Sequence, residues 1–334
     1  MEETWSSILK ANPTYNFLQS PLWGEVNRLL GHKLVVRTFE NKALYLGIVK
    51  DAKRGRYLEI PGGPVVDWSN NSLVKQVFKS ILEEAEKEKC VFIRFRPQLF
   101  NTPENQKLIA ELPKLLPELD LRPAPMHLHA QNTVILDLTQ SEEDLLMAMR
   151  RQTRYEVRRA DKLGLRVVED SSETAFEEFH AVQAETAQRQ NFVPPSKKEL
   201  LAERTAFSPN NLKLYKVLTE DNQPVAYGLI LIYDQKAEYF EAASTELNRK
   251  LPGAYALLWR AIRDLKAEHI ERFNLWGIAP PGVERHRYSG VTTFKTGFGG
   301  EVVEFIPAQD IVVSKLRYKL DELVETTRKK KRNL

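Results

Sequence analysis

The sequence of 334 residues has a single cysteine, Cys90, and its longest apolar run, around Tyr227 to Tyr233, is short. One cysteine excludes a disulfide framework and a cysteine-based metal site, and so short an apolar run cannot cross a bilayer as a helix. The chain begins with acidic residues, whereas a secretory signal begins with basic residues and a long apolar stretch. We therefore expect a soluble protein that works in the cytoplasm.

Signatures of the common enzyme classes are missing as well. The sequence contains no phosphate-binding P-loop, no Rossmann glycine motif, no nucleophile elbow and no zinc-protease helix. His127 and His129 would share one side of a strand, but no cysteine or third histidine is close to them. We expect no metal site.

The net charge is small, but it is unevenly distributed. Lys and Arg exceed Asp and Glu only by 49 to 45. Residues 145–166 hold seven basic and two acidic residues, and residues 315–332 hold eight basic and three acidic residues, so each segment carries +5 and the rest of the chain −6. This layout indicates a polyanionic partner: a nucleic acid, an anionic membrane surface or a phosphorylated substrate. The alternative is a solvated helix face and a frayed terminus.

The pattern of expected elements occurs twice. Three strands, a helix of period 3.6 and a fourth strand are predicted at 33–40, 44–50, 56–66, 70–89 and 91–96, and again at 212–219, 224–233, 237–244, 253–269 and 272–276. Tyr57-Leu-Glu corresponds to Tyr239-Phe-Glu at an offset of 182 residues, and the strands around both keep the same spacing. The repeat predicts an α+β protein with two domains of one topology.

The rest of the chain is assigned around this repeat. The N-terminal domain is expected at residues 1–138, the C-terminal domain at 139–313, and a basic helix at 314–334 that packs back on the first domain. One helix is expected from Ser141, which offers a capping-box-like start, to about Gly164.

The repeated topology resembles the fold of GCN5-related N-acetyltransferases (GNAT), which implies tandem GNAT-like domains. Those enzymes hold the pyrophosphate of coenzyme A on a glycine-rich loop at a helix N-terminus. Here that place is occupied by Arg249-Lys-Leu-Pro-Gly-Ala, in which Pro252 offers no N–H donor. We therefore expect no coenzyme A and no other cofactor.

A glycine-rich segment follows the second repeat. Six of the fifteen glycines lie between Gly277 and Gly300, together with several cationic and aromatic residues. Such a segment must make several tight turns, and it is a suitable place for a substrate loop. The alternative is a solvent-exposed loop followed by a strand.

Seven segments, taken in order, carry a family resemblance. They are Gln19-Ser-Pro-Leu-Trp-Gly, Ile60-Pro-Gly-Gly-Pro, Thr133-Val-Ile-Leu-Asp-Leu, the basic stretch from Arg150 to Gly164, Glu185-Thr-Ala-Gln-Arg-Gln-Asn-Phe, Leu251-Pro-Gly-Ala-Tyr-Ala-Leu-Leu-Trp and Gly290-Val-Thr-Thr-Phe-Lys-Thr-Gly-Phe-Gly-Gly. By these segments the chain resembles the FemABX family of peptidoglycan bridge-forming aminoacyltransferases, in its shorter form without a coiled-coil arm.

The resemblance implies transfer of an amino acid from aminoacyl-tRNA to an amino group of a peptidoglycan precursor, either a UDP-MurNAc-peptide or lipid II. It implies Lys295 as the catalytic residue that stabilises the tetrahedral oxyanion. It also implies that the precursor is bound by Lys33, Arg189, Arg287, Tyr288 and Phe294. Asn274 stands where family members often have Asp.

The charge pattern fits such substrates, because tRNA and the precursor are both polyanions. We expect tRNA to contact Arg150, Arg151, Arg154, Arg158 and Arg159, with Arg150, Arg154 and Arg158 on one helix face. The basic C-terminal tail could contact tRNA or an anionic membrane, which would place the protein at the inner face of the membrane. We expect a monomer. Two alternatives stay open: a related transferase with another activated donor or a protein N-terminal acceptor, and a non-catalytic nucleic-acid-binding protein.

Overall fold

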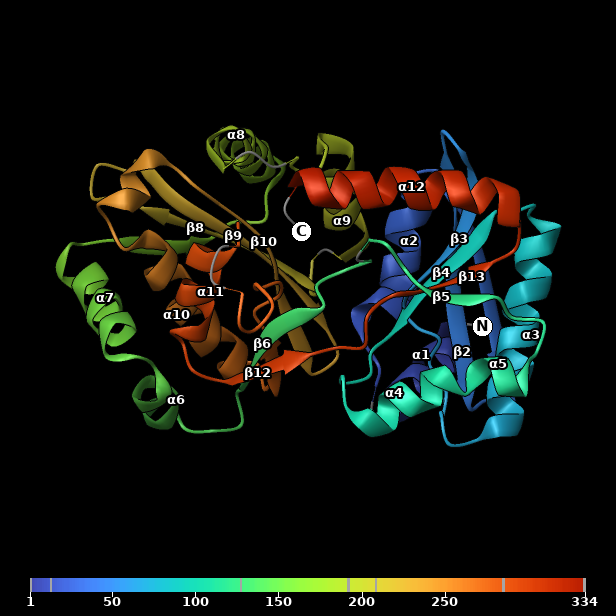
Figure 1. The fold of residues 1–334 in the computed structure, drawn as a ribbon. Helices are drawn as coiled ribbons and strands as arrows, with labels where there is room; N and C mark the ends of the chain where they lie inside the picture. The colour runs from blue at the N-terminus through green and yellow to red at the C-terminus, as the bar shows by residue number, and fades with distance from the viewer. Residues whose placement is uncertain are drawn as a thin grey trace. The chain divides into compact units, whose positions relative to one another are not determined.

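The computed structural model describes residues 2–12, 14–126, 128–190, 193–207, 209–283 and 286–332. The chain divides into two compact units, each built around its own sheet (Figure 1). Unit 1 comprises Met1–Gln131 and Glu304–Leu334, and unit 2 comprises Asn132–Val303. His127, one of the two histidines considered above as metal ligands, lies outside the described residues.

Unit 1 contains a six-stranded sheet. Its order is β1-β2-β3-β4-β13-β5, from Lys33–Phe39, Ala43–Ala52, Gly55–Gly62, Phe92–Pro97, Gln309–Val312 and Leu121–Pro123. Strands β3 and β4 run parallel, and α3 (Asn71–Lys87) makes the crossover between them. The Asn70 side chain caps α3 by accepting from the Leu73 N–H. The predicted hairpin, helix and following strand of the first repeat are confirmed, and the structure shows that this last strand is parallel to β3.

The two faces of this sheet are covered differently. On one face Phe78 of α3 packs edge-on against Phe95 of β4, within the main core of the unit. On the other face Phe92 of β4 contacts Tyr318 of α12 (Lys315–Arg332) in a smaller cluster. The remaining helices of unit 1 are α1 (Glu2–Ala11), η1 (Phe17–Gln19), α2 (Pro21–Leu29), α4 (Pro103–Ala110) and α5 (Leu112–Leu115).

Unit 2 contains a seven-stranded sheet. Its order is β12-β6-β11-β10-β9-β8-β7, from Glu301–Glu304, Asn132–Asp137, Arg272–Asn274, Lys236–Ser244, Pro224–Tyr233, Leu212–Leu218 and Arg166–Glu169. The parallel pair is β10 and β11, and α10 (Gly253–Ala267) connects them. This is the predicted second copy of hairpin, helix and strand. The other helices are α6 (Glu142–Ala148), α7 (Arg151–Lys162), α8 (Glu173–Gln190), α9 (Lys197–Phe207), η2 (Glu246–Arg249) and α11 (Ser289–Thr296).

The two units divide the chain at other residues than the expected domain boundaries, and one strand of each sheet is affected. Strand β6, expected at the end of the first domain, pairs with β11 in unit 2. Strand β13, expected in the second domain, pairs with β4 and β5 in unit 1. The chain therefore crosses between the units before residue 132 and again near residue 304, because each sheet takes a strand that the repeat alone does not assign.

The single helix expected from Ser141 to about Gly164 is wrong. The chain leaves the helix at Met149 and Arg150, where both residues are extended, and α7 starts at Arg151. The N–H of Arg150 donates instead to the carbonyl of Gly297. The periodicity and the capping signal were right, but a tertiary hydrogen bond breaks the helix at its centre.

The described residues contain neither a membrane-spanning helix nor a cluster of metal ligands. Across those parts of the chain, no helix is long and apolar enough to span a membrane. In the same residues, no group of three or more potential ligands is arranged for a metal ion.

Candidate functional site

Lys295 is a buried cation in unit 2. It lies on α11 and is 8% exposed, and its ammonium donates to the carbonyl of Gly277 at 3.0 Å. The ammonium also lies 5.8 Å from the centre of the Tyr239 ring on β10. Burial lowers the pKa of Lys295 to about 7, and no carboxylate of the described residues counteracts that shift. A buried lysine without a counter-charge is poised to respond to a negative charge placed beside it.

Asn274 holds the strand end next to the carbonyl partner of Lys295. Its side-chain oxygen accepts from the Trp276 N–H at 2.9 Å and from the Thr133 hydroxyl. Trp276 adopts a left-handed conformation with φ of 63°, so β11 ends at Asn274 and the chain turns toward Gly277. The neutral amide of Asn274 holds this turn without adding a negative charge near Lys295, which agrees with the low pKa of the lysine.

Three other residues of the glycine-rich segment were predicted to bind substrate. Phe294 packs edge-on against Tyr255 and Phe298, with ring centres 5.0 and 5.4 Å apart, so it fastens α11 to α10. Arg287 lies over the ring of Tyr288 at 5.3 Å, and Tyr288 is 38% exposed. These two form an exposed cationic and aromatic pair just before α11.

A shallow hollow of about 320 Å³ lies beside α11. Its lining includes Pro280, Pro281 and Thr293, but Lys295 is not part of it. The hollow therefore opens on a different side of α11 from the buried ammonium.

Arg189 is engaged within unit 2. It lies in the last turn of α8, and its guanidinium donates to the carbonyl of Ser244 and forms an ion pair with Glu246 at 3.1 Å. These contacts fasten the end of α8 to the end of β10. A phosphate could reach this guanidinium by replacing Glu246, which is largely exposed.

Lys33 lies in unit 1, at the start of β1. Its ammonium forms an ion pair with Glu88 at 2.6 Å, and the lysine side chain is 61% exposed. Lys33 thus remains accessible, although its charge is already partly balanced.

The five arginines predicted to bind tRNA separate into two groups. Arg150, Arg154 and Arg159 donate to backbone carbonyls of Thr293, Met147 and Lys250, respectively. Arg151 and Arg158 are exposed and make no hydrogen bond or ion pair with the described parts of the chain. The predicted face of Arg150, Arg154 and Arg158 does not form, because Arg150 precedes α7.

A different stripe of α7 faces solvent. Arg151, Tyr155, Arg158 and Lys162 are all exposed, and their spacing of four, three and four residues places them along one side of the helix. A row of cations with an exposed aromatic ring suits a nucleic-acid backbone and an unpaired base.

Two neighbouring carboxyls of unit 2 were not predicted from the sequence, the buried Glu203 and the partly buried Glu241. Glu241 of β10 accepts from Gln183 of α8 at 2.5 Å, and burial raises the pKa of Glu241 to about 7. Burial also raises the pKa of Glu203 on α9 well above its usual value, and the charge of Glu241 adds to this shift. Glutamates inside otherwise apolar strand and helix patterns were the available signal for these positions.

Comparison with known proteins places the chain in a family. The FemAB family model matches residues 2–199 and 194–326. The aminoacyltransferase FemA of Staphylococcus epidermidis is 25% identical over 114 residues, which are 33% of this chain and 27% of FemA. The match thus spans about a quarter of the length of that curated relative.

Solved structures share the fold. FemX superposes with a TM-score of 0.83 and 15% identity, covering 96% of this chain and 98% of FemX. The C-terminal domain of a lysylphosphatidylglycerol synthetase from Agrobacterium fabrum gives a TM-score of 0.59 at 12% identity, covering 97% of both chains. The expected α+β fold of tandem GNAT-like domains is confirmed.

Proposed function

The chain belongs to the FemAB family, and on that premise we propose that it is an aminoacyltransferase of peptidoglycan bridge formation. The proposed donor is aminoacyl-tRNA, and the proposed acceptor is an amino group of a UDP-MurNAc-peptide or of lipid II. The observation that carries the proposal is the buried ammonium of Lys295, which no carboxylate in the described parts of the chain balances.

The reaction requires the enzyme only to position the two substrates and to stabilise the negative charge of the intermediate. The acceptor amine attacks the ester carbonyl, the new C–N bond forms, and the C–O bond to the tRNA ribose breaks. The proton lost by the amine ends on the departing ribose oxygen, so atoms balance without a cofactor. The negative oxygen of the tetrahedral intermediate is the charge that Lys295 would stabilise.

The solvent-facing stripe of α7 is the proposed tRNA contact. Arg151, Arg158 and Lys162 would neutralise phosphates, and Tyr155 would offer a stacking surface. The proposed role of the other three arginines is structural, since Arg150, Arg154 and Arg159 donate to backbone carbonyls around α7.

The proposed acceptor contacts are Lys33, Arg189, Arg287 and Tyr288, with Phe294 as a positioning residue. Arg189 and Lys33 would exchange exposed or partly exposed carboxylate partners for phosphate oxygens. Phe294 would keep α11, and with it Lys295, in place through its contact with Tyr255.

We place the protein in the cytoplasm as a monomer, with peripheral contact to the membrane through α12. Leu316, Leu320 and Leu323 are 83, 62 and 66% exposed along one side of that helix, and Lys315, Arg317 and Lys319 lie among them in sequence. An apolar stripe bordered by cations fits the interface of an anionic bilayer. Lipid II would be found at such a surface.

The test is transfer by the purified protein, measured as a mass gain of the acceptor. Each charged tRNA is incubated with UDP-MurNAc-pentapeptide or with lipid II in vesicles. Lys295→Met is expected to lower the transfer rate by about 10²–10³-fold, as the loss of one oxyanion donor does, with tRNA binding unchanged. Lys266→Met is the matched control, because Lys266 also donates to backbone carbonyls of unit 2 but lies on α10.

Three outcomes decide between this function and its alternatives. No mass gain with any of the twenty amino acids would refute the proposal. Transfer to a peptide N-terminus or from another activated ester in place of tRNA would favour a related transferase. Binding of tRNA without any transfer would favour a nucleic-acid-binding protein.

A further inference from the structure

Arg96 is a fully buried arginine of unit 1 that no acid among the described residues balances. It lies near the end of β4 and is 1% exposed, and its Nε and Nη1 atoms are buried without a hydrogen-bond partner. Burial lowers the pKa of Arg96 to about 10, and no neighbouring charge counteracts that shift. The guanidinium therefore remains a cation at neutral pH, in a place where an isolated charge is costly.

Among the described residues, the surroundings of Arg96 supply no acid that neutralises it. Its guanidinium lies 5.4 Å from the centre of the Phe305 ring. Burial lowers the pKa of His129 to about 3, and the charges of Arg96 and Lys50 add to that effect. The imidazole is neutral, and Lys50 also interacts with the buried carboxyl of Glu59. Arg96 is thus the cation here that no described acid neutralises, so the ligand that fits it is an anion.

A second buried group without a partner lies one residue beyond the end of β4. The side-chain oxygen of Gln98 is buried and accepts no hydrogen bond. An inorganic anion would satisfy only the donors of Arg96, whereas Gln98 needs a donor on the ligand. A carboxylate that carries an N–H on the adjacent carbon provides both groups, and the C-terminal residue of a peptide has this chemistry.

We propose that Arg96 and Gln98 recognise the free carboxyl terminus of a peptide. The guanidinium of Arg96 binds the carboxylate, and the Gln98 oxygen accepts from the N–H of the terminal residue. The identification of this peptide with the peptide part of the acceptor rests on the proposed function; the recognition itself does not.

The rings beside Arg96 come from segments outside the regular elements. Phe305 and His129, the two rings whose interaction with Arg96 is described above, both lie in connecting segments, after β12 and after β5. Binding of the peptide would displace these rings and leave the strands of the sheet unchanged.

The test compares a peptide acid with its amide on the full chain. N-acetyl-alanyl-alanine, the same peptide with a C-terminal amide, and inorganic phosphate are titrated by calorimetry. The acid is expected to bind at least tenfold more tightly than the amide. Arg96→Met removes this preference, Arg96→Lys retains part of it, and Gln98→Leu weakens binding of the acid several-fold. The control is Arg122→Met, because Arg122 is half-exposed and paired with Asp120.

The results separate the two proposals. Equal binding of acid and amide, or a preference that persists in Arg96→Met, would overturn the inference. Phosphate binding that depends on Arg96 without any peptide preference would overturn the peptide assignment. Wild-type protein that transfers an amino acid but ignores the carboxylate refutes only the inference, whereas protein that binds the acid through Arg96 but transfers nothing refutes only the proposed function.

Discussion

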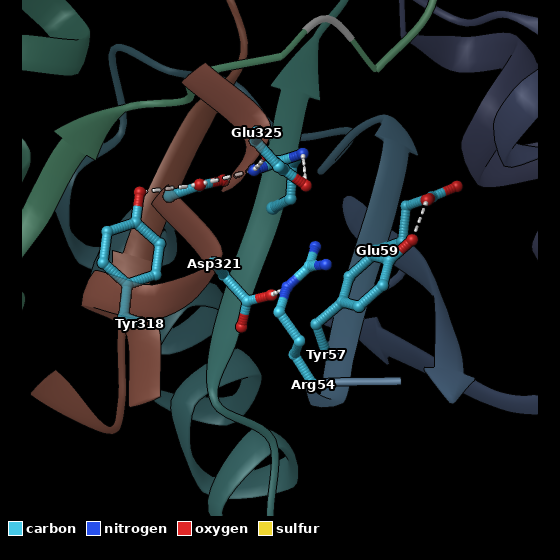
Figure 2. Close-up of polar contacts among 8 residues, drawn as sticks. Arg54, Tyr57, Glu59, Tyr318, Asp321 and Glu325 are labelled. Atoms are coloured by element: carbon cyan, nitrogen blue, oxygen red, sulfur yellow. Dashed lines mark hydrogen bonds and ion pairs between the residues drawn. The ribbon is translucent and has the colours of Figure 1, made fainter. Parts of the chain in front are cut away.

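Strand β4 carries two buried arginines, two residues apart, that have opposite surroundings. Arg94 forms ion pairs at 2.8 Å with Asp310 of β13 and with Glu325 of α12, and Tyr318 donates to Asp310 at 2.9 Å. Figure 2 shows this cluster between α12 and the sheet, with the separate pair of Arg54 and Asp321 beside it. Arg96 has no such partner.

The different partners of Arg94 and Arg96 indicate a structural role for the first and a ligand-binding role for the second. Because the carboxylates of Asp310 and Glu325 raise the pKa of Arg94, its charge stabilises the docked helix. An unbalanced cation such as Arg96 or Lys295 contributes nothing comparable to folding, so a ligand is the natural source of the missing charge. The predictions below test this distinction, from the largest expected effect to the smallest.

The largest effect is expected for Arg94→Met. The substitution leaves Asp310, which is 0% exposed, as an unbalanced buried carboxylate, and the loss of one partner of a buried pair costs about 3–5 kcal/mol of unfolding free energy. Urea denaturation measures this loss, and limited proteolysis reports release of α12. The double variant Arg94→Met with Asp310→Leu should recover part of the stability; equal loss in both would contradict the ion-pair explanation.

Lys295 offers a second test, through pH. Its pKa of about 7 in the folded protein lies below its ordinary value, so the cation needed for oxyanion stabilisation is lost as the pH rises above 7. The ratio of the transfer rate of wild type to that of Lys295→Arg should therefore fall between pH 7 and pH 9, because arginine keeps its charge. The ratio cancels the titration of the acceptor amine, and a constant ratio would refute the role of the charge.

The same shift affects folding with a definite sign. Between pH 7 and about pH 10 the unfolded chain binds the proton of Lys295 more strongly than the folded chain does, so this residue's contribution to stability rises with pH. In Lys295→Met that rise should be absent from the urea midpoints, and the variant should be at least as stable as wild type at pH 7. A rise of the same size in both proteins would show that Lys295 does not cause it.

Arg96→Met should leave the unliganded protein as stable as wild type or raise its unfolding free energy by about 1–2 kcal/mol. The reason is that methionine fills a similar volume without a buried charge, and replacing buried charges by apolar side chains is often neutral or stabilising. Thermal and urea unfolding without peptide check this. A loss close to that of Arg94→Met would show that Arg96 is structural, and the comparison within β4 would fail.

The partners of these residues explain which features of the fold could be predicted from the sequence and which could not. The periodicity of α3 and the offset of 182 residues predict both copies of the topology, because these features depend on local patterns. In Phe92-Ile-Arg-Phe-Arg-Pro the two arginines look alike, and the carboxylates that distinguish them lie more than 200 residues away in sequence. The helix break at Arg150 and the placement of β6 and β13 likewise depend on distant partners.

The residues of the candidate site could likewise be predicted only in part from the sequence. Lys295 was found through a sequence motif, and its burial and low pKa agree with the role that the motif implies. Arg96 and Gln98 escaped notice because a buried polar group without a partner has no local signature: burial is decided by what packs against it. The expected arginine face failed for the same reason, since the carbonyls that bind Arg150 and Arg159 come from other elements.

The smallest effect concerns cations at the surface of α7, where the same distinction applies. Arg158 has no hydrogen-bond or ion-pair partner in the part of the chain that the structure describes, whereas the neighbouring Arg159 pairs with Glu156 and donates to the Lys250 carbonyl. If tRNA lies along the stripe of Arg151, Tyr155, Arg158 and Lys162, Arg158→Gln removes about one phosphate contact, and the slope of log affinity against log salt falls by about 1. Arg159→Gln should leave that slope unchanged, because this guanidinium already binds the protein. Filter binding of tRNA over a salt series measures both slopes, and equal changes in the two variants would mean that partnered and unpartnered arginines contact tRNA alike.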